Sequence, residues 1–303
     1  MAALNGVNGR ATARVEPLLK WPGGKRWLAP TLAPILATEC RGRYFEPFLG
    51  SGAVFLALQP QRAVLSDNNA ELIQSLRALR SSPAEVLDRV WRFSNSEECY
   101  YSVRDSRPTT RVGAAARFIY LNRTCWGGIH RLNQRGEFNV PFGNSGRIIC
   151  RRCYLEDNAR SLKRAKLLCG DFEVTMREAR SGDVVYADPP YTTKGQHNGF
   201  VRYNEKLFAW RDQKRLANAA RQAARRGAFV AISGLWHKDL LRLYPGWWRM
   251  RLDRPSNVAG DPAYRGRAEE VVLFSRAPSA LKNLGGRHRR LAPFHPGEAD
   301  PQR

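Results

Sequence analysis

The sequence predicts an α/β protein built on an open, mainly parallel β-sheet that is interrupted by a mostly helical insert. Three observations predict this fold class. Short apolar runs typical of buried strands recur along the chain, and helical patterns follow several of them. This alternating order, which implies a parallel sheet, breaks in an Arg-rich and aromatic-rich stretch from about 81 to 164. The length of 303 residues fits one large domain or one domain carrying an insert.

The individual elements are expected in the following order. The first strands lie at 43–48 and 63–66, and each is followed by a helix, at 52–59 and 69–79. Helices in the insert lie at 83–93, 112–121 and 154–163, around a Gly/Asn-rich loop at 127–146. Strands resume at 166–169, 183–187, 228–233 and 270–275, with a helix at 211–226. We expect disorder in the small, polar segment 1–15 and in the basic, proline-containing tail 278–303.

Charge is the most unusual property of the composition. The chain carries 50 Lys and Arg against 27 Asp and Glu, a formal net charge of +23. Such an excess favours a polyanionic partner, with nucleic acid as the first candidate. Arg-rich codon usage in a GC-rich genome is the alternative.

Other sequence signals place the protein in the reducing cytoplasm. The chain contains no apolar run long enough to span a membrane and no signal-peptide pattern near its start. Its six cysteines do not form a disulfide framework. Cys150 and Cys153 form a lone CxxC, whereas a zinc site needs a second pair of ligands. We therefore expect no metal.

The run Asp188 to Tyr191, Asp-Pro-Pro-Tyr, follows the strand expected at 183–187. Pro189 and Pro190 fix two φ angles and remove two N–H donors, so the loop is stiff and extended. A carboxylate, carbonyl oxygens and a flat ring then lie side by side. This arrangement suits a planar amine, because the oxygens accept from the NH2 group while the ring stacks on the base. The alternative is an ordinary turn in which Tyr191 fills the core or the surface.

A loop containing two glycines joins the first strand to its helix. It spans Phe45 to Gly52, Phe-Glu-Pro-Phe-Leu-Gly-Ser-Gly, and its small residues let a ligand approach the backbone. The second strand ends near Asp67, at about the 20-residue spacing from the loop at which an acid accepts ribose hydroxyls. NAD, FAD and S-adenosylmethionine sites share this arrangement, although the loop lacks the full GxGxxG spacing of NAD sites. The alternative role for Asp67 is to cap the helix at 69–79.

The segment Lys20 to Lys25, Lys-Trp-Pro-Gly-Gly-Lys, precedes the first strand. It forms a tight loop with one aromatic ring and two cations, which suits a carboxylate and an adenine-like ring. Its glycine and lysine spacing does not match a Walker A phosphate loop. A plain turn is the alternative.

In combination, these runs resemble one family, the D12-class, Dam-like DNA adenine N6-methyltransferases. Segments 20–25, 45–52, 67–69 and 188–191 resemble its KWxGGK motif, FxPFxGSG loop, D-x-N element and DPPY motif. Segment 120–128 resembles its YLN-[KR]-x-x-[FW]-x-G element, and 131–143 resembles its R-x-N-x-x-G-x-F-N-V-P-F-G signature. The runs 200–204 and 232–234 also match by order, so the resemblance spans about 18 to 275.

The resemblance implies a Rossmann-like methyltransferase sheet with a reversed last strand pair, S-adenosylmethionine as cofactor and N6-methyladenine as product. Residues 16–80 and 165–277 would form the catalytic domain, and 81–164 the target-recognition insert. By position, the catalytic residues would be Asp188, Pro189, Pro190 and Tyr191. The residues that would contact or line the cofactor are Trp21, Lys25, Phe45, Pro47, Gly50, Ser51, Asp67, Asp171, Phe172 and Asp188.

Double-stranded DNA is the expected partner. Adenine inside a duplex cannot reach such a pocket, so the base must flip out, and Tyr191 would stack on it. The residues expected to contact DNA are Lys20, Arg123, Arg131, Leu132, Asn133 and Arg135. Arg135 is the best candidate to contact guanine, through O6 and N7. For each arginine, a phosphate contact or a solvated surface is the alternative.

Three positions depart from the family pattern: Pro22, Leu132 and Gly234 stand where a small residue, a Tyr and an Asn are expected. They bear on the recognised sequence and not on the reaction. Methylation of RNA adenine, of cytosine N4 or of protein glutamine, and a DNA-binding relative without activity, are the alternative functions. We further expect a monomer or weak dimer, with a cognate restriction endonuclease as a candidate partner.

Overall fold

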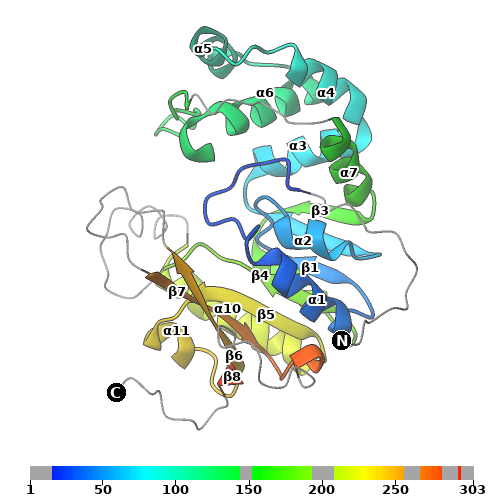
Figure 1. Cartoon of the computed structure of the whole chain (residues 1–303), viewed down its shortest axis with the longest axis vertical. Helices are drawn as coiled ribbons and strands as arrows, with labels where there is room; N and C mark the ends of the chain where they lie inside the picture. The colour runs from blue at the N-terminus through cyan, green and yellow to red at the C-terminus, as the bar shows by residue number, and fades with distance from the viewer. Residues whose placement is uncertain (1–15, 144–151, 193–207, 256–266, 282–292, 295–303) are drawn as a thin grey trace, which may run out of the picture.

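An eight-stranded β-sheet forms the centre of the computed structural model, which describes residues 16–143, 152–192, 208–255, 267–281 and 293–294 (Figure 1). The order of its strands is β3-β2-β1-β4-β5-β7-β6-β8. Parallel pairing joins β3 (Ala165–Cys169), β2 (Ala63–Asp67), β1 (Tyr44–Glu46), β4 (Val184–Ala187) and β5 (Phe229–Leu235). Antiparallel pairing adds β7 (Arg267–Phe274), β6 (Trp248–Pro255) and β8 (Pro293–Phe294). The predicted α/β class and the reversed last strand pair are confirmed.

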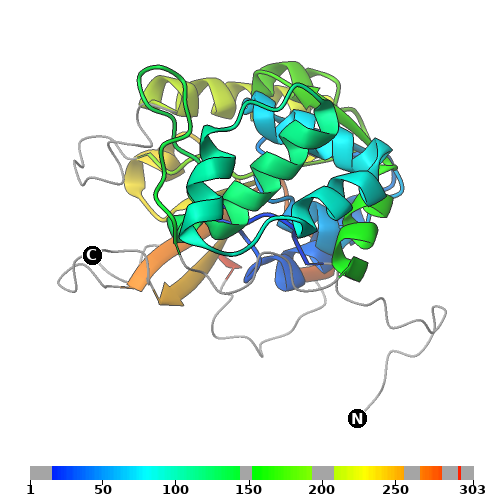
Figure 2. The same ribbon diagram turned by 90° about the horizontal axis from the view of Figure 1, so that it is seen from above.

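Alternation along the strands divides the apolar side chains into two cores. In β4, Tyr186 belongs to one core and its neighbour Val185 to the other, because successive side chains point to opposite faces. The first face is covered by α1 (Ala29–Glu39), α2 (Ala53–Leu58) and α3 (Ala70–Ser81). The second face is covered by α8 (Phe172–Arg177), α10 (Trp210–Arg225) and α11 (Lys238–Arg242). Figure 2 shows the blue α1 and the yellow α10 on opposite sides of the molecule.

The parallel strands bring several polar groups to one edge of the sheet. Glu46 ends β1, Asp67 ends β2 and Asp188 follows β4. The carboxyl ends of parallel strands meet at the same edge, where ligands bind in open α/β sheets. The fold therefore gathers the sequence-predicted loops that follow these strands.

The stretch predicted as an insert is helical. It contains α4 (Pro83–Trp91), α5 (Glu97–Asp105), α6 (Arg111–Thr124), the 3-10 turn η1 (Trp126–Gly128) and α7 (Arg152–Leu162). In Figure 1, α4, α5 and α6 lie beyond α3, at the far end of the molecule from β8. Buried Tyr100, Tyr120 and Val140 belong to a third apolar core in this part. The division of the chain into a catalytic and a recognition domain stays a prediction.

The N-terminal segment is fastened to α6 through one buried asparagine. The Asn122 side-chain carbonyl accepts a hydrogen bond from the Lys20 N–H (2.9 Å), and its NH2 group donates to the Lys20 carbonyl (2.8 Å). Gly128 packs against the Lys20 side chain so closely that an added Cβ would lie 2.4 Å from Lys20 Cβ. These contacts set the position of the loop at 20–25 relative to the insert.

Among the described residues, the sequence prediction missed six helices and strands: α1, α5, α8, α11, β6 and the short β8. Pro30 and Pro34 argue against a helix in the sequence, and α1 was therefore not predicted. Pro30 lies in the first turn of α1, where no N–H is needed. Buried Trp248, Met250 and Leu252 alternate with arginines in β6, a strand signal that charge obscured.

The predicted disordered tail is wrong for two short pieces: residues 279–281 form a 3-10 turn, and β8 pairs with β6. Segment 1–15, the motif at 200–204 and the basic run at 287–290 lie outside the described residues.

We predict that Asn122→Ala lowers the free energy of unfolding by about 2 kcal/mol, because this largely buried side chain loses two hydrogen bonds to the backbone. Urea unfolding measures this change. Asn218→Ala, at an exposed position on α10, is the matched control and should change stability by less than about 0.5 kcal/mol. Equal effects of the two substitutions would contradict a fastening role for Asn122.

Candidate functional site

A buried ion pair lies where the N-terminal loop meets the end of β4. Lys25, only 4% exposed, places its Nζ 3.0 Å from Asp188 Oδ1, and the same ammonium donates to the Gly23 carbonyl (2.7 Å). Lys25 Nζ also lies over the ring of Tyr191, 4.7 Å from its centre. Three residues predicted from two separate motifs therefore form one cluster.

Burial sets the protonation of this cluster. It raises the pKa of the Asp188 carboxyl, and the adjacent Lys25 ammonium opposes that rise. Burial also holds the pKa of the Tyr191 hydroxyl well above its usual value, so the phenol stays neutral. Pro189 is buried beside them, and no cis peptide bond occurs in the described residues.

The loop after β1 is shaped by Asp67 and Trp21. The Gly50 N–H donates to Asp67 Oδ2 (3.0 Å), while Asp67 Oδ1 accepts from the Asn69 N–H (2.9 Å). Gly50 has a φ of 48°, and an added Cβ would lie 2.8 Å from the Trp21 indole. Only glycine fits there without moving the indole. Asn69, and not Asp67, caps α3 by accepting from the Leu72 N–H, so the alternative role for Asp67 is wrong.

Glu46 is a buried carboxyl at this edge that the sequence prediction missed. It ends β1, is 3% exposed and accepts a hydrogen bond from the Tyr44 hydroxyl (2.9 Å). Burial raises its pKa to about 8, and the nearby charges of Asp188 and Asp67 add to the rise. Its position before Pro47, inside the predicted loop, was the available signal.

The remaining predicted cofactor residues differ in exposure. Phe45 and Pro47 are buried, and Ser51 is half-buried at the start of α2. Asp171 caps α8 and pairs with Arg215 (2.9 Å). Phe172 lies in the second core with the Arg215 guanidinium over its ring. The structure thus places these residues beside the strand ends, with Phe172 largely enclosed by protein.

A hairpin-like loop presents the predicted DNA-reading residues. Leu132 and Phe138 form a backbone bridge, and the Asn133 side-chain carbonyl accepts from the N–H groups of Arg135 and Glu137. Arg135 is exposed at the tip of this loop, whereas the Arg131 guanidinium donates to Asn139 Oδ1 (2.9 Å).

Two of the predicted DNA-contacting residues also have contacts within the protein, and their contact with DNA stays a prediction. Lys20 Nζ donates to the Arg123 carbonyl (2.9 Å), and Arg123 Nη1 donates to the Leu18 carbonyl (3.3 Å). Both side chains therefore help to hold the N-terminal segment on α6.

Two exposed apolar side chains also belong to this region. Trp126 in η1 is 61% exposed and Leu132 is 46% exposed. The sequence prediction missed Trp126, although an aromatic residue between Cys125 and two glycines was its signal.

No group of three His, Cys, Asp or Glu side chains among the described residues is arranged to hold a metal ion. Cys150 lies outside those residues. Within the described part of the chain, no helix combines the length and apolar character needed to cross a membrane.

The sheet order, the glycine loop and the acid at the end of β2 define a Rossmann-like fold with a nucleotide-binding edge. The sequence matches the family described as D12 class N6 adenine-specific DNA methyltransferase over residues 21–244, and the chain belongs to that family. The protein is therefore a DNA adenine methyltransferase with DNA as its substrate. The family and fold imply S-adenosylmethionine as cofactor.

Relatives align over most of their length. The chain is 32% identical to the Type II methyltransferase M1.LlaDCHI of Lactococcus lactis subsp. cremoris, an alignment covering 86% of this chain and 95% of that protein. It is 31% identical to the Type II methyltransferase M.MjaIII of Methanocaldococcus jannaschii (86% and 99% covered). It is also 31% identical to a DNA adenine methylase of Vibrio cholerae (84% and 94% covered). These matches confirm the predicted family.

We predict that Glu46 makes folding stability fall as pH rises. Because burial raises its pKa from 4.5 to about 8, the folded state keeps a proton that the unfolded state releases between these values. The stabilisation is complete below the lower value and is lost as pH rises through the upper one, by about 1.4 kcal/mol per pH unit. Urea unfolding at several pH values across this range measures the free energy of unfolding. Plotted against pH, this free energy should fall less steeply for Glu46→Gln than for the wild type. Glu85→Gln, on the exposed side of α4, should keep the wild-type slope.

Proposed function

We propose that the chain methylates N6 of one specific adenine after that base has flipped out of duplex DNA, and that Asp188 to Tyr191 hold the flipped base. The observation that carries the proposal is the cluster of buried Lys25 with the partly exposed Asp188 and Tyr191 at the carboxyl end of β4. A rigid carboxylate beside a fixed aromatic ring is the arrangement that a planar amine requires.

Hydrogen bonds from the adenine NH2 group to the protein would make its nitrogen a better nucleophile. The N6 lone pair of adenine is delocalised into the ring, which makes the amine a poor nucleophile. Asp188 and the Pro189 carbonyl would accept both NH2 hydrogens, favour a tetrahedral nitrogen and offset the positive charge that develops on it. Lys25, at 3.0 Å, supports the ionised form of Asp188 despite its burial. Tyr191 would stack on the base.

The residues at the strand ends fit S-adenosylmethionine. Gly50 lets the Trp21 indole pack directly on the loop backbone, and Asp67 is placed to accept ribose hydroxyls. The Asp188 carboxylate gives this edge a negative charge that suits a cation. When bound, S-adenosylmethionine supplies a methyl group activated by the sulfonium charge, so no covalent enzyme intermediate is needed.

DNA would lie against the hairpin-like loop of residues 131–139. Arg135 is exposed at its tip and is our candidate for guanine recognition, while the apolar Leu132 and Trp126 can wedge against unstacked bases. Contacts between the basic surface and phosphates can offset the few kcal/mol that unstacking costs. The expected restriction endonuclease and the monomer or weak dimer stay predictions.

We predict that Asp188→Ala abolishes methyl transfer and leaves DNA affinity largely intact, because the amine loses its acceptor. Tritium transfer from labelled S-adenosylmethionine to DNA, followed by mapping of N6-methyladenine, measures activity, and fluorescence anisotropy measures DNA binding. Asp188→Asn, which keeps one oxygen acceptor, should retain more activity than Asp188→Ala. Full activity of the alanine variant would overturn the mechanism.

We predict that Arg135→Ala relaxes discrimination at one base pair by about 1–3 kcal/mol. Competition binding with duplexes that differ at single positions measures this change. Arg177→Ala, at a position on α8 that is also strongly exposed, is the matched control and should leave specificity unchanged. Uniform weakening across all sequences would identify Arg135 as a phosphate contact.

A further inference from the structure

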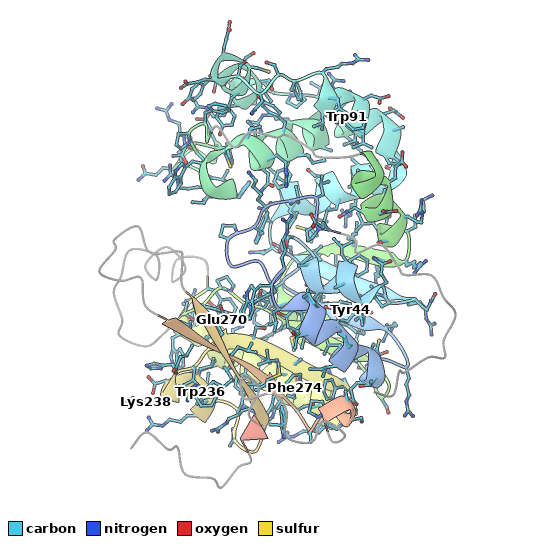
Figure 3. The ribbon with its side chains drawn as sticks, viewed as in Figure 1. Tyr44, Trp91, Trp236, Lys238, Glu270 and Phe274 are labelled. Carbon is cyan, nitrogen blue, oxygen red and sulfur yellow. The ribbon has the colours of Figure 1, made fainter. Side chains whose placement is uncertain are left out.

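Glu270 is a buried carboxylate at the site that none of the predicted motifs contains. It lies on β7, is 4% exposed, and its Oε2 accepts a hydrogen bond from the Tyr191 hydroxyl (2.7 Å). The same oxygen lies 3.8 Å from Lys25 Nζ. Figure 3 labels Glu270 near the start of β7, on the side of the sheet nearer to α3.

The register of the sheet explains how an antiparallel strand reaches this loop. Ala187, the last residue of β4, is level with Ile232 on β5. Glu270 is level with Leu235, three residues further along β5, and therefore lies beyond the end of β4, toward the loop that begins with Asp188. Alternation then puts Glu270 on the same face as Val272, which lies in the core that also contains α1. The segment carrying Lys25 leads directly into that helix.

Glu270 contacts both Tyr191 and Lys25, the two side chains that belong to the cluster around Asp188. The prolines restrict the backbone before Tyr191 but leave the side-chain torsions of Tyr191 free. The hydrogen bond from the Tyr191 hydroxyl to Glu270 and the Lys25 ammonium over the ring together fix the orientation of the Tyr191 ring. Lys25 is in turn shared between two carboxylates, at 3.0 Å from Asp188 and 3.8 Å from Glu270.

We propose that Glu270 is a positioning residue for methyl transfer: it orients the Tyr191 ring for stacking and draws the Lys25 ammonium partly away from Asp188, which keeps Asp188 available to the amine. The inference rests on the proposed roles of Asp188 and Tyr191. Glu270 itself does not touch the reacting atoms. Its effect should therefore appear in the rate of transfer and not in cofactor or DNA affinity.

The test separates kcat from KM in two variants. Glu270→Gln keeps an oxygen for the Tyr191 hydroxyl but removes the charge facing Lys25, and we expect kcat to fall on the order of tenfold. Glu270→Ala removes both contacts, and we expect a loss on the order of a hundredfold. KM for S-adenosylmethionine and for DNA should change less than about twofold in both variants.

A double-mutant cycle with Tyr191→Phe tests the coupling. Tyr191→Phe keeps the ring and removes the hydroxyl, so adding Glu270→Ala should cost less in this background than alone. The matched control is Glu269→Gln, the adjacent carboxylate on the opposite face, which pairs with Arg251 and should leave kcat unchanged. Urea unfolding identifies any variant that loses its fold, and Glu270→Gln supplies the measurement if Glu270→Ala does not fold.

Two results would overturn the inference: additive effects in the cycle, or a rise in KM with kcat unchanged. Asp188→Ala, assayed in parallel, distinguishes this failure from failure of the proposed function. If Asp188→Ala is inactive while both Glu270 variants keep full kcat, only the positioning role is lost. If Asp188→Ala is active, the proposed function fails.

Discussion

The buried ion pair between Lys25 and Asp188 is the interaction on which the rest of the site depends. An ammonium and a carboxylate that leave water lose solvation worth several kcal/mol each, so each stabilises the other at this position. The pair therefore ties the N-terminal loop to the end of β4. Tyr191 and Glu270 complete the surroundings of Lys25, so four side chains from three separate parts of the chain constrain one another.

The loop beside this pair owes its shape to backbone constraints. Gly50 adopts a left-handed conformation under the Trp21 indole, and Asp67 holds the loop by accepting its N–H. Proline provides the same rigidity after β4 by another route, through restricted φ angles. Both loops are thus ordered before any ligand binds, which reduces the entropy lost when a reactant is oriented.

The stretch from Asn122 to Arg135 contains both residues that hold the N-terminal segment and residues that are exposed to solvent. Within one stretch that matches the family pattern, Asn122 and Arg123 fasten the N-terminal segment, whereas Trp126 and Arg135 face solvent. The fastening contacts place the loop of residues 131–139 at a set position relative to Lys25. One docked segment therefore sets the position of this loop relative to the Lys25–Asp188 pair.

The sequence by itself determined the order of most strands and helices and the loops that carry Lys25, Asp67 and Asp188, because these follow from local periodicity and backbone chemistry. The reversed end of the sheet was expected from the family resemblance. Only the tertiary structure decided which of the many charged side chains are buried partners. Glu46 and Glu270 look like any other strand acid in sequence, and no local pattern shows that Lys20 also donates a hydrogen bond to the Arg123 carbonyl. Their roles depend on strand register and long-range packing, which local pattern does not encode.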